Sequence, residues 1–214
     1  MADNYLEKKF EEFHSSKSGA PKPKAMAKNP SLNSLLLKNR SYRGYDSSYI
    51  VSEEELLKIV EVYTKIPSAK NQQPLRFKLI TSEDAPRLQQ YTKWAGALPE
   101  LNLPFPGTEP NAFIIICTTV AENKWVDIDL GIAAQSMLLK AVELGLNGIC
   151  IGAFNKTEVI NEFGLQYEPL LVLAIGKGAE NIQLTAISAD EPHNYYRKNG
   201  VHFVPKLGMK DLVL

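Results

Sequence analysis

Two continuous apolar runs constrain the fold of this chain more than any other feature. They are AFIIICTT, at residues 112–119, and PLLVLAIGKG, at residues 169–178. Both are short, and neither contains a charged residue before the end of the second run. A strand without polar alternation needs cover on both faces, because neither face can be left in water. The two runs therefore predict a sheet that lies between two layers of helices.

Helix signals alternate with these strands. Ser52 and Glu55 form a capping box before an apolar-periodic helix at 52–66, and Asn155 with Glu158 repeats that pattern before 155–165. The longest helix lies at 125–148 and closes on the C-terminal signal of Gly145. Segment 82–98 also has a helical pattern, and 76–82 and 148–152 are short strands. The class is α/β or α+β, in three layers.

The first 31 residues differ from the rest of the chain. Leu6, Phe10 and Phe13 have the spacing of a short amphipathic helix. The segment KSGAPKPKAMAKNP, at 17–30, follows with four lysines, three prolines and no acid, which is a linker composition. We predict an N-terminal helical arm and linker at 1–31, laid on the body or on a partner chain, and one domain at 32–214.

The charge balance argues against several classes of partner. Lysine and arginine number 24 and are balanced by 24 acidic residues, so no overall basic field attracts nucleic acid or a membrane surface. No apolar run approaches the roughly 20 residues of a transmembrane helix. The charged N-terminus lacks the apolar centre of a signal peptide. We expect a cytoplasmic protein, because its two cysteines lie in apolar contexts that suggest reduced thiols.

Neither a metal site nor a cysteine nucleophile is expected. Cys117 and Cys150 lie in apolar contexts that suggest buried, reduced thiols, although a disulfide between them stays open. There is no CxxC pair, and His14, His193 and His202 have no ligand spacing.

Several common catalytic motifs are absent as well. No GxGxxG follows a strand, GKGAE lacks the P-loop spacing, and there is no GxSxG. Asp127 and Asp129 stand two apart at the start of the longest helix. Their position favours a cap and helix-dipole role over paired acid–base chemistry.

The stretch NRSYRGYD, at 39–46, concentrates positive charge at the end of a leucine-rich helix. Arg40 and Arg43 flank the hydroxyl of Ser41. Two guanidinium groups and a short donor suit a phosphate. The alternative is a solvated helix end whose arginines face water or pair with carboxylates.

Three segments in a fixed order make the chain resemble the FMN-dependent nitroreductase family. They are Arg-Ser-x-Arg at 40–43, PSAKNQQP at 67–74 and GLNGICIGAF at 145–154. The resemblance spans about residues 32–214, and the tail at 195–214 is similar to the C-termini of small members. It implies an α+β, three-layer helix/sheet/helix fold with FMN at a homodimer interface.

The same resemblance assigns residues to the FMN phosphate. They are Arg40, Ser41, Arg43 and, near the C-terminus, Lys206. Many family members carry arginine just before this group, where the present chain has Asn39. Phosphate binding is therefore expected to depend more on Arg43 and Lys206.

Two further segments match the family's contacts to the flavin ring. In the first, the residues are Pro67, Ser68, Ala69, Asn71 and Gln73. The carboxamide of Asn71 carries a donor and an acceptor, which suits the pyrimidine edge of the ring. The alternative is a proline-rich loop that ends a helix, with Asn71 as a turn residue.

The second segment, Gly152 and Ala153, matches the place where members direct a backbone N–H at flavin N5. Glycine permits close approach of the backbone to the ring. The alternative is that Gly152 merely ends a strand.

The resemblance implies ping-pong transfer of a hydride from NADH or NADPH through FMN to nitroaromatic or quinone-like acceptors. No catalytic side chain is assigned, because the cofactor carries the chemistry. Segment 94–110 is the candidate substrate lid. Alternatives on the same scaffold are a flavin-dependent dehalogenase, a flavin-modifying enzyme and a non-catalytic FMN-binding protein.

Overall fold

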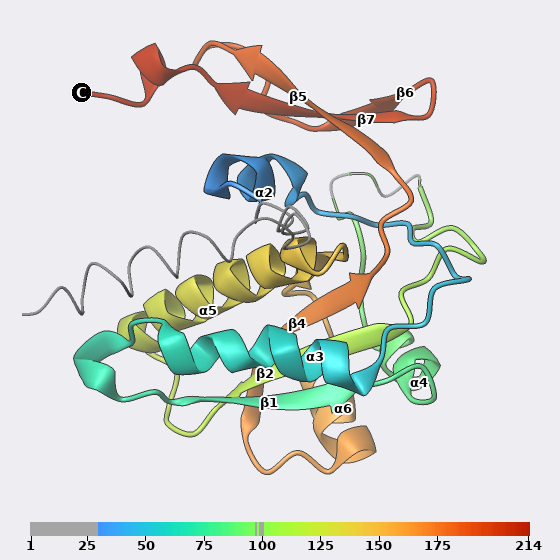
Figure 1. The fold of residues 1–214 in the computed structure, drawn as a ribbon, viewed down its shortest axis with the longest axis vertical. Helices are drawn as coiled ribbons and strands as arrows, with labels where there is room; N and C mark the ends of the chain where they lie inside the picture. The colour runs from blue at the N-terminus through green and yellow to red at the C-terminus, as the bar shows by residue number, and fades with distance from the viewer. Residues whose placement is uncertain (1–29, 97, 99–100) are drawn as a thin grey trace, which may run out of the picture. The chain divides into compact units, whose positions relative to one another are not determined.

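A computed structural model of the protein describes residues 30–96, 98 and 101–214. Residues Leu32–Leu214 form one unit, whose helices and strands are labelled in Figure 1. The predicted arm helix around Leu6 and Phe13, and its linker up to residue 29, lie outside the described residues.

The two apolar runs form the central strands of a four-stranded sheet. Its strands are β1 (Leu75–Ile80), β2 (Ala112–Thr118), β3 (Asn147–Ile151) and β4 (Glu168–Gly176), in the order β1-β2-β4-β3. Every neighbouring pair is antiparallel, with Ile114 opposite Leu173 in the central pair. All seven residues of β2 are buried, as its lack of polar alternation predicts.

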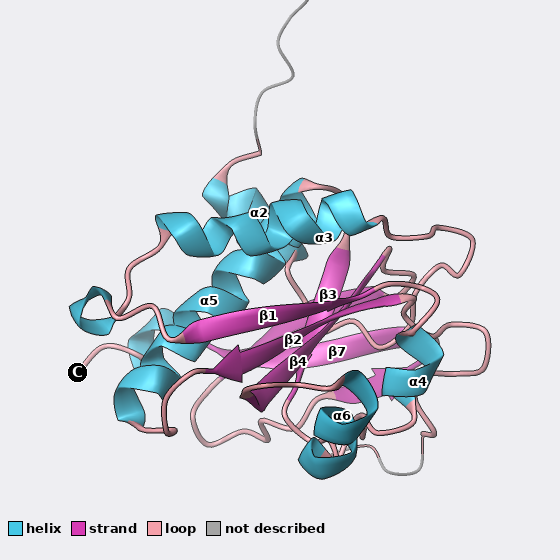
Figure 2. Ribbon diagram, turned by 90° about the horizontal axis from the view of Figure 1, so that it is seen from below, coloured by secondary structure: helices cyan, strands magenta, loops and turns pink. Residues whose placement is uncertain are grey.

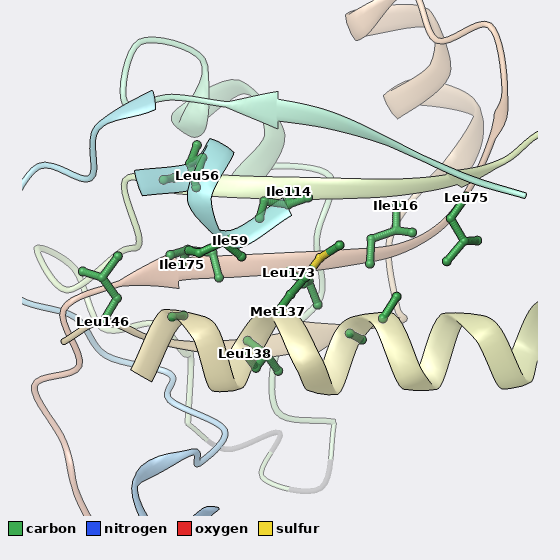
Figure 3. Close-up of a cluster of buried hydrophobic side chains, with 14 of the residues drawn as sticks. Leu56, Ile59, Leu75, Ile114, Ile116, Met137, Leu138, Leu146, Leu173 and Ile175 are labelled. Carbon is green, nitrogen blue, oxygen red and sulfur yellow. The ribbon is translucent and has the colours of Figure 1, made fainter. Parts of the chain in front are cut away.

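Helices cover both faces of this sheet (Figure 2). On one side lie α3 (Glu53–Val60) and α5 (Lys124–Glu143), and on the other α4 (Ala85–Gln89) and α6 (Lys156–Phe163). Ile114 and Ile116 of β2 join the α3 and α5 core, whereas Phe113 and Ile115 join the α4 and α6 core. Figure 3 shows the first core, where Met137 of α5 meets the sheet. The three-layer helix/sheet/helix arrangement is confirmed.

The predicted capping residues agree with the structure, with one exception. Ser52 and Glu55 form the capping box of α3, which continues as a 3₁₀ turn over Glu61–Lys65. Asn155 caps α6. The exception is α5, whose N-cap is Asn123. The cap role suggested for the aspartates of that helix is wrong for Asp129, because its side chain is buried and binds a loop.

The helical pattern of 82–98 produces only the short helix α4. Its first turn contains Pro86, which fits there because proline lacks the N–H that a first turn leaves unpaired. Beyond Gln89 the chain bonds elsewhere: Thr92 bridges Phe154, and Lys93 N donates to Ala153 O at 2.8 Å. Tertiary pairing therefore overrides the local helical preference.

A second sheet follows the main one in the chain. It contains β5 (Asn181–Ile187), β6 (Tyr196–Lys198) and β7 (Val201–Leu207), in the order β5-β7-β6, with β5 and β7 parallel. The chain ends after a 3₁₀ turn at Met209–Asp211. Helix α2 (Leu32–Lys38) packs against α5 and leads into the basic segment at 40–43.

Candidate functional site

A cavity of about 320 Å³ gathers the predicted phosphate residues. It lies between the segment after α2, helix α5, the edge strand β3 and the C-terminal sheet. Four of its lining residues are those assigned to the phosphate: Arg40, Ser41, Arg43 and Lys206. Asn39 and Gln135 line it as well.

The free edge of β3 fixes the path of the basic segment. Ser41 forms a parallel bridge with Gly148, and Tyr42 N donates to Gly148 O at 3.2 Å. A Cβ at Gly148 would stand 2.5 Å from the carbonyl oxygen of Ala174, so this strand position requires glycine. Nη2 of Arg40 donates to Leu36 O at 2.6 Å, at the end of α2. One guanidinium therefore satisfies a helix-end carbonyl while its other atoms line the cavity.

Arg43 is held more tightly than its neighbours. It is 7% exposed, and Nη1 donates to Ser41 O at 3.1 Å. Its guanidinium lies 4.8 Å from the ring centre of Tyr195, and Nη1 is 3.4 Å from Nε2 of His202. Glu180 accepts from the backbone N–H of Arg43 and pairs with Arg197. Arg43 thus connects the basic segment to the C-terminal sheet.

Arginine N–H groups without hydrogen-bond partners indicate that the cavity suits an anion. Among the described residues, Nε of Arg40 and Nε of Arg43 are buried without a hydrogen-bond partner. Buried N–H groups without acceptors are unfavourable, and the oxygens of an anion would satisfy them. Along β7, His202, Val204 and Lys206 line the cavity, as period-2 alternation of a strand requires. The donor set fits the phosphate of a cofactor such as FMN.

His202 gives the site a pH dependence. Burial, together with Arg43 and Arg197, lowers the pKa of His202 from 6.5 to about 4, and Glu180 opposes the shift. The folded protein therefore favours the neutral ring. Its contribution to stability is complete above pH 6.5 and is lost as the pH falls toward about 4.

We therefore expect the free energy of unfolding to fall by up to roughly 3 kcal/mol over that interval because of His202. Urea unfolding at several pH values, for wild type and His202→Gln, measures this contribution. The free energy of unfolding should change less with pH in the variant than in wild type. An equal change in both proteins would contradict the role given to this ring.

The loop predicted to contact the flavin ring is anchored from α5. Oγ of Ser68 donates to Oδ2 of Asp129 at 2.5 Å, and Ala69 N donates to Oδ1 at 2.8 Å. Gln73 N donates to Oγ of Ser68 at 2.9 Å. Lys70, Asn71 and Gln73 have positive φ angles of 51°, 54° and 46°. The loop is a tight structure whose conformation depends on these bonds.

The predicted ring residues do not share the phosphate cavity. Ala69 lines a separate cavity of about 290 Å³ with Trp125 and Asp129. Gln73 lines a groove beside α3, and Ala153 lines a third hollow beside Tyr91. Within the described residues of one chain, the residues assigned to the phosphate line one cavity. The residues assigned to the flavin ring do not line that cavity.

The remaining candidates are placed as follows. Both cysteines are free, and Cys117 is buried as expected. The expectation for Cys150 is wrong: it is exposed, because it lies on the edge strand facing the cavity. Among the residues described, no cluster of His, Cys, Asp or Glu is arranged to hold a metal. None of their helices has the length and apolar character to cross a membrane.

Sequence reasoning missed four residues of this region: Asp129, Glu180, Tyr195 and His202. His202 reaches the basic segment from β7, and Glu180 and Tyr195 reach it from the residues just before β5 and β6, which local patterns do not indicate. Asp129 carried a usable signal, since a carboxylate that falls among the buried positions of a helix needs partners.

The sequence pattern of the nitroreductase family matches residues 36–177. The Bacillus subtilis (strain 168) protein named Putative NAD(P)H nitroreductase YdgI is 27% identical over 192 residues, which cover 72% of this chain and 92% of that protein.

Solved structures share the fold. A nitroreductase family protein from Clostridium difficile 630 aligns with a TM-score of 0.53 and 27% identity, over 68% of this chain and 83% of that one. A putative nitroreductase in complex with FMN, from Exiguobacterium sibiricum 255-15, aligns with a TM-score of 0.58 and 22% identity, over 71% and 90%. These likenesses confirm the α+β nitroreductase fold predicted from the sequence.

Proposed function

Since the chain belongs to the nitroreductase family, we propose that it is an NAD(P)H-dependent flavin oxidoreductase that uses FMN and reduces nitroaromatic or quinone-like acceptors. The observation that carries this proposal is the cavity lined by Arg40, Ser41, Arg43 and Lys206, two of which have a buried Nε without a hydrogen-bond partner. The two free thiols fit a reducing compartment, and we place the protein in the cytoplasm.

Bound FMN would supply the hydride chemistry, taking a hydride from NADH or NADPH and passing electrons to an acceptor in a second half-reaction. The protein's residues bind and orient it. Arg40, Ser41 and Lys206 hold the phosphate by charge-assisted hydrogen bonds. Arg43 adds its charge from a buried position and keeps the C-terminal sheet beside the cavity.

The loop at 67–73 and the turn at 152–153 are proposed to contact the ring. A Cβ at Gly152 would meet nothing within 4 Å, so the space beside this backbone is free for a planar group. The hydroxyl proton of Ser68 is already donated to Asp129, and Ser68 therefore offers the cofactor only an acceptor. Oδ1 of Asn71 accepts from Nε2 of Gln73 at 3.0 Å, which leaves its second lone pair and the NH₂ donors of the carboxamide for the pyrimidine edge.

Separation of the two sets of residues supports a homodimer with shared sites. The phosphate cavity of one chain would be completed by the ring loop of its partner. Exposed apolar side chains are available to a second copy near the C-terminus and on α2; they include Leu32, Leu37, Met209, Leu212 and Val213. An isologous dimer is the commonest way to bury such surfaces.

Cofactor identity tests this proposal. We expect protein purified in the presence of flavins to retain FMN and not FAD, because the donor set suits a terminal phosphate. Mass spectrometry of the cofactor released by heat identifies it. Release of FAD, or of no flavin after reconstitution with FMN, would contradict the proposal.

A further inference from the structure

Asp129 is a buried carboxylate whose role lies outside its own helix. It is 2% exposed, and it follows Val126 and precedes Ala133 at helical spacing, two α5 residues that belong to the buried core. None of the ion pairs found among the described residues includes it. Both of its oxygens accept hydrogen bonds from the loop, one from Ser68 and one from Ala69. A buried charge is tolerated only when its oxygens are satisfied, so the carboxylate and the loop depend on each other.

The loop needs such an anchor because its backbone is strained. The backbones of Lys70, Asn71 and Gln73 adopt left-handed conformations, which residues other than glycine rarely take. Such conformations persist only where surrounding contacts determine them. The contacts here form a chain: Asp129 holds Ser68 and Ala69 at the start of the loop, and Oγ of Ser68 accepts from Gln73 N at its end.

We propose that Asp129 is a positioning residue, which fixes the loop at 68–73 in the conformation that presents Asn71 to the flavin ring. The proposal rests on the proposed FMN function for its second half. Its first half, that Asp129 determines the loop conformation, holds for the protein without any cofactor.

A helix-dipole role does not account for Asp129. Asp127 lies in the first turn of α5 and is exposed, so it fits that role. Asp129 lies further into the helix, and its oxygens are occupied by the loop. The two aspartates therefore form a matched pair, one with loop contacts and one without them.

The first measurement uses flavin-free protein. Amide hydrogen exchange at Ala69 and Gln73 is compared in wild type, Asp129→Asn, Ser68→Ala and the control Asp127→Asn. Asparagine keeps the shape of the side chain but replaces one acceptor oxygen by a donor NH₂. Exchange at both amides should become about tenfold faster or more in Asp129→Asn, and Ser68→Ala should accelerate it at Gln73. Asp127→Asn should match wild type.

The second measurement titrates the same variants with FMN and records the visible band of the bound flavin. Asp129→Asn should weaken binding about tenfold or more and alter the band, because the loop no longer meets the ring in one conformation. Arg40→Ala provides the contrast. It should weaken binding but leave the band and the loop amides unchanged, since it acts at the phosphate.

The outcomes separate the two claims. If Asp129→Asn exchanges at the wild-type rate and binds FMN with the wild-type band, the positioning role is overturned, while FMN binding by wild type still stands. If the loop amides respond but wild type binds no FMN, the proposed function fails and the flavin half of this inference fails with it.

Discussion

Replacing Arg40 and Lys206 together by alanine should abolish FMN retention while the protein stays folded. Each side chain lines the phosphate cavity, and each would lose a charge-assisted contact of about 1.5–3 kcal/mol. The two losses together predict a fall in affinity on the order of a hundred-fold to ten-thousand-fold. Titration of the flavin-free protein with FMN, followed by quenching of flavin fluorescence, measures this change.

Arg43 is a poorer choice for that experiment, although the sequence resemblance gives it more weight than Arg40. It is 7% exposed and contacts Tyr195 and His202, so its removal would disturb the C-terminal sheet as well as the cavity. Lys38→Ala provides a control, because Lys38 is exposed at the end of α2 and does not line the cavity. A folded double variant with wild-type FMN affinity would show that the phosphate binds elsewhere.

Complementation between two defective chains should restore about half of the wild-type flavin, as expected when one of two symmetric sites is intact. One chain carries Arg40→Glu, which places a carboxylate in the phosphate cavity. The other carries Asn71→Ala with Ser68→Ala, which removes loop contacts. If each site combines the cavity of one chain with the loop of the other, a mixed dimer contains one site with both defects and one with neither.

The mixed dimer is purified through two different tags and compared with each variant alone. Wild-type chains carrying the same tags give the reference for full occupancy. Sites built within one chain would leave a defect in both sites of the mixed dimer. No recovery of flavin over the two variants would then be seen, and the shared-site arrangement would be wrong.

The sequence predicted the main sheet well for a specific reason. Strands β2 and β4 are so apolar that only a position between two helical layers suits them, and the structure places them at the centre of the sheet. Helix α5 and the caps at Ser52 and Asn155 are also local features, which short stretches of sequence specify.

The second sheet could not be predicted in this way. Strand β5 is exposed at four of its seven positions and intermediate at the other three, so its sequence lacks a clear core-facing pattern. Its partner β7 lies beside it in parallel, joined by a long connection rather than a tight turn. Pairing of this kind depends on tertiary contacts and not on a local sequence pattern.

In the candidate site, too, some residues could be assigned from the sequence, whereas contacts that depend on tertiary packing could not. Arg40, Ser41, Arg43 and Lys206 were assigned through a family resemblance, and the structure brings them to one cavity, although their role at a phosphate stays a prediction. The contact of Asp129 with Ser68 joins residues 61 positions apart. No spacing rule indicates such a contact, because it depends on how α5 packs beneath the loop.

Anaerobic mixing with NADH or NADPH tests the central claim most directly. The protein is reconstituted with FMN, freed of excess flavin and mixed with the nicotinamide while its visible absorbance is followed. We predict that the band of the bound flavin bleaches, and that a nitroaromatic or a quinone added afterwards restores it. A spectrum that stays unchanged with both nicotinamides would contradict an oxidoreductase and leave a protein that binds FMN without turnover.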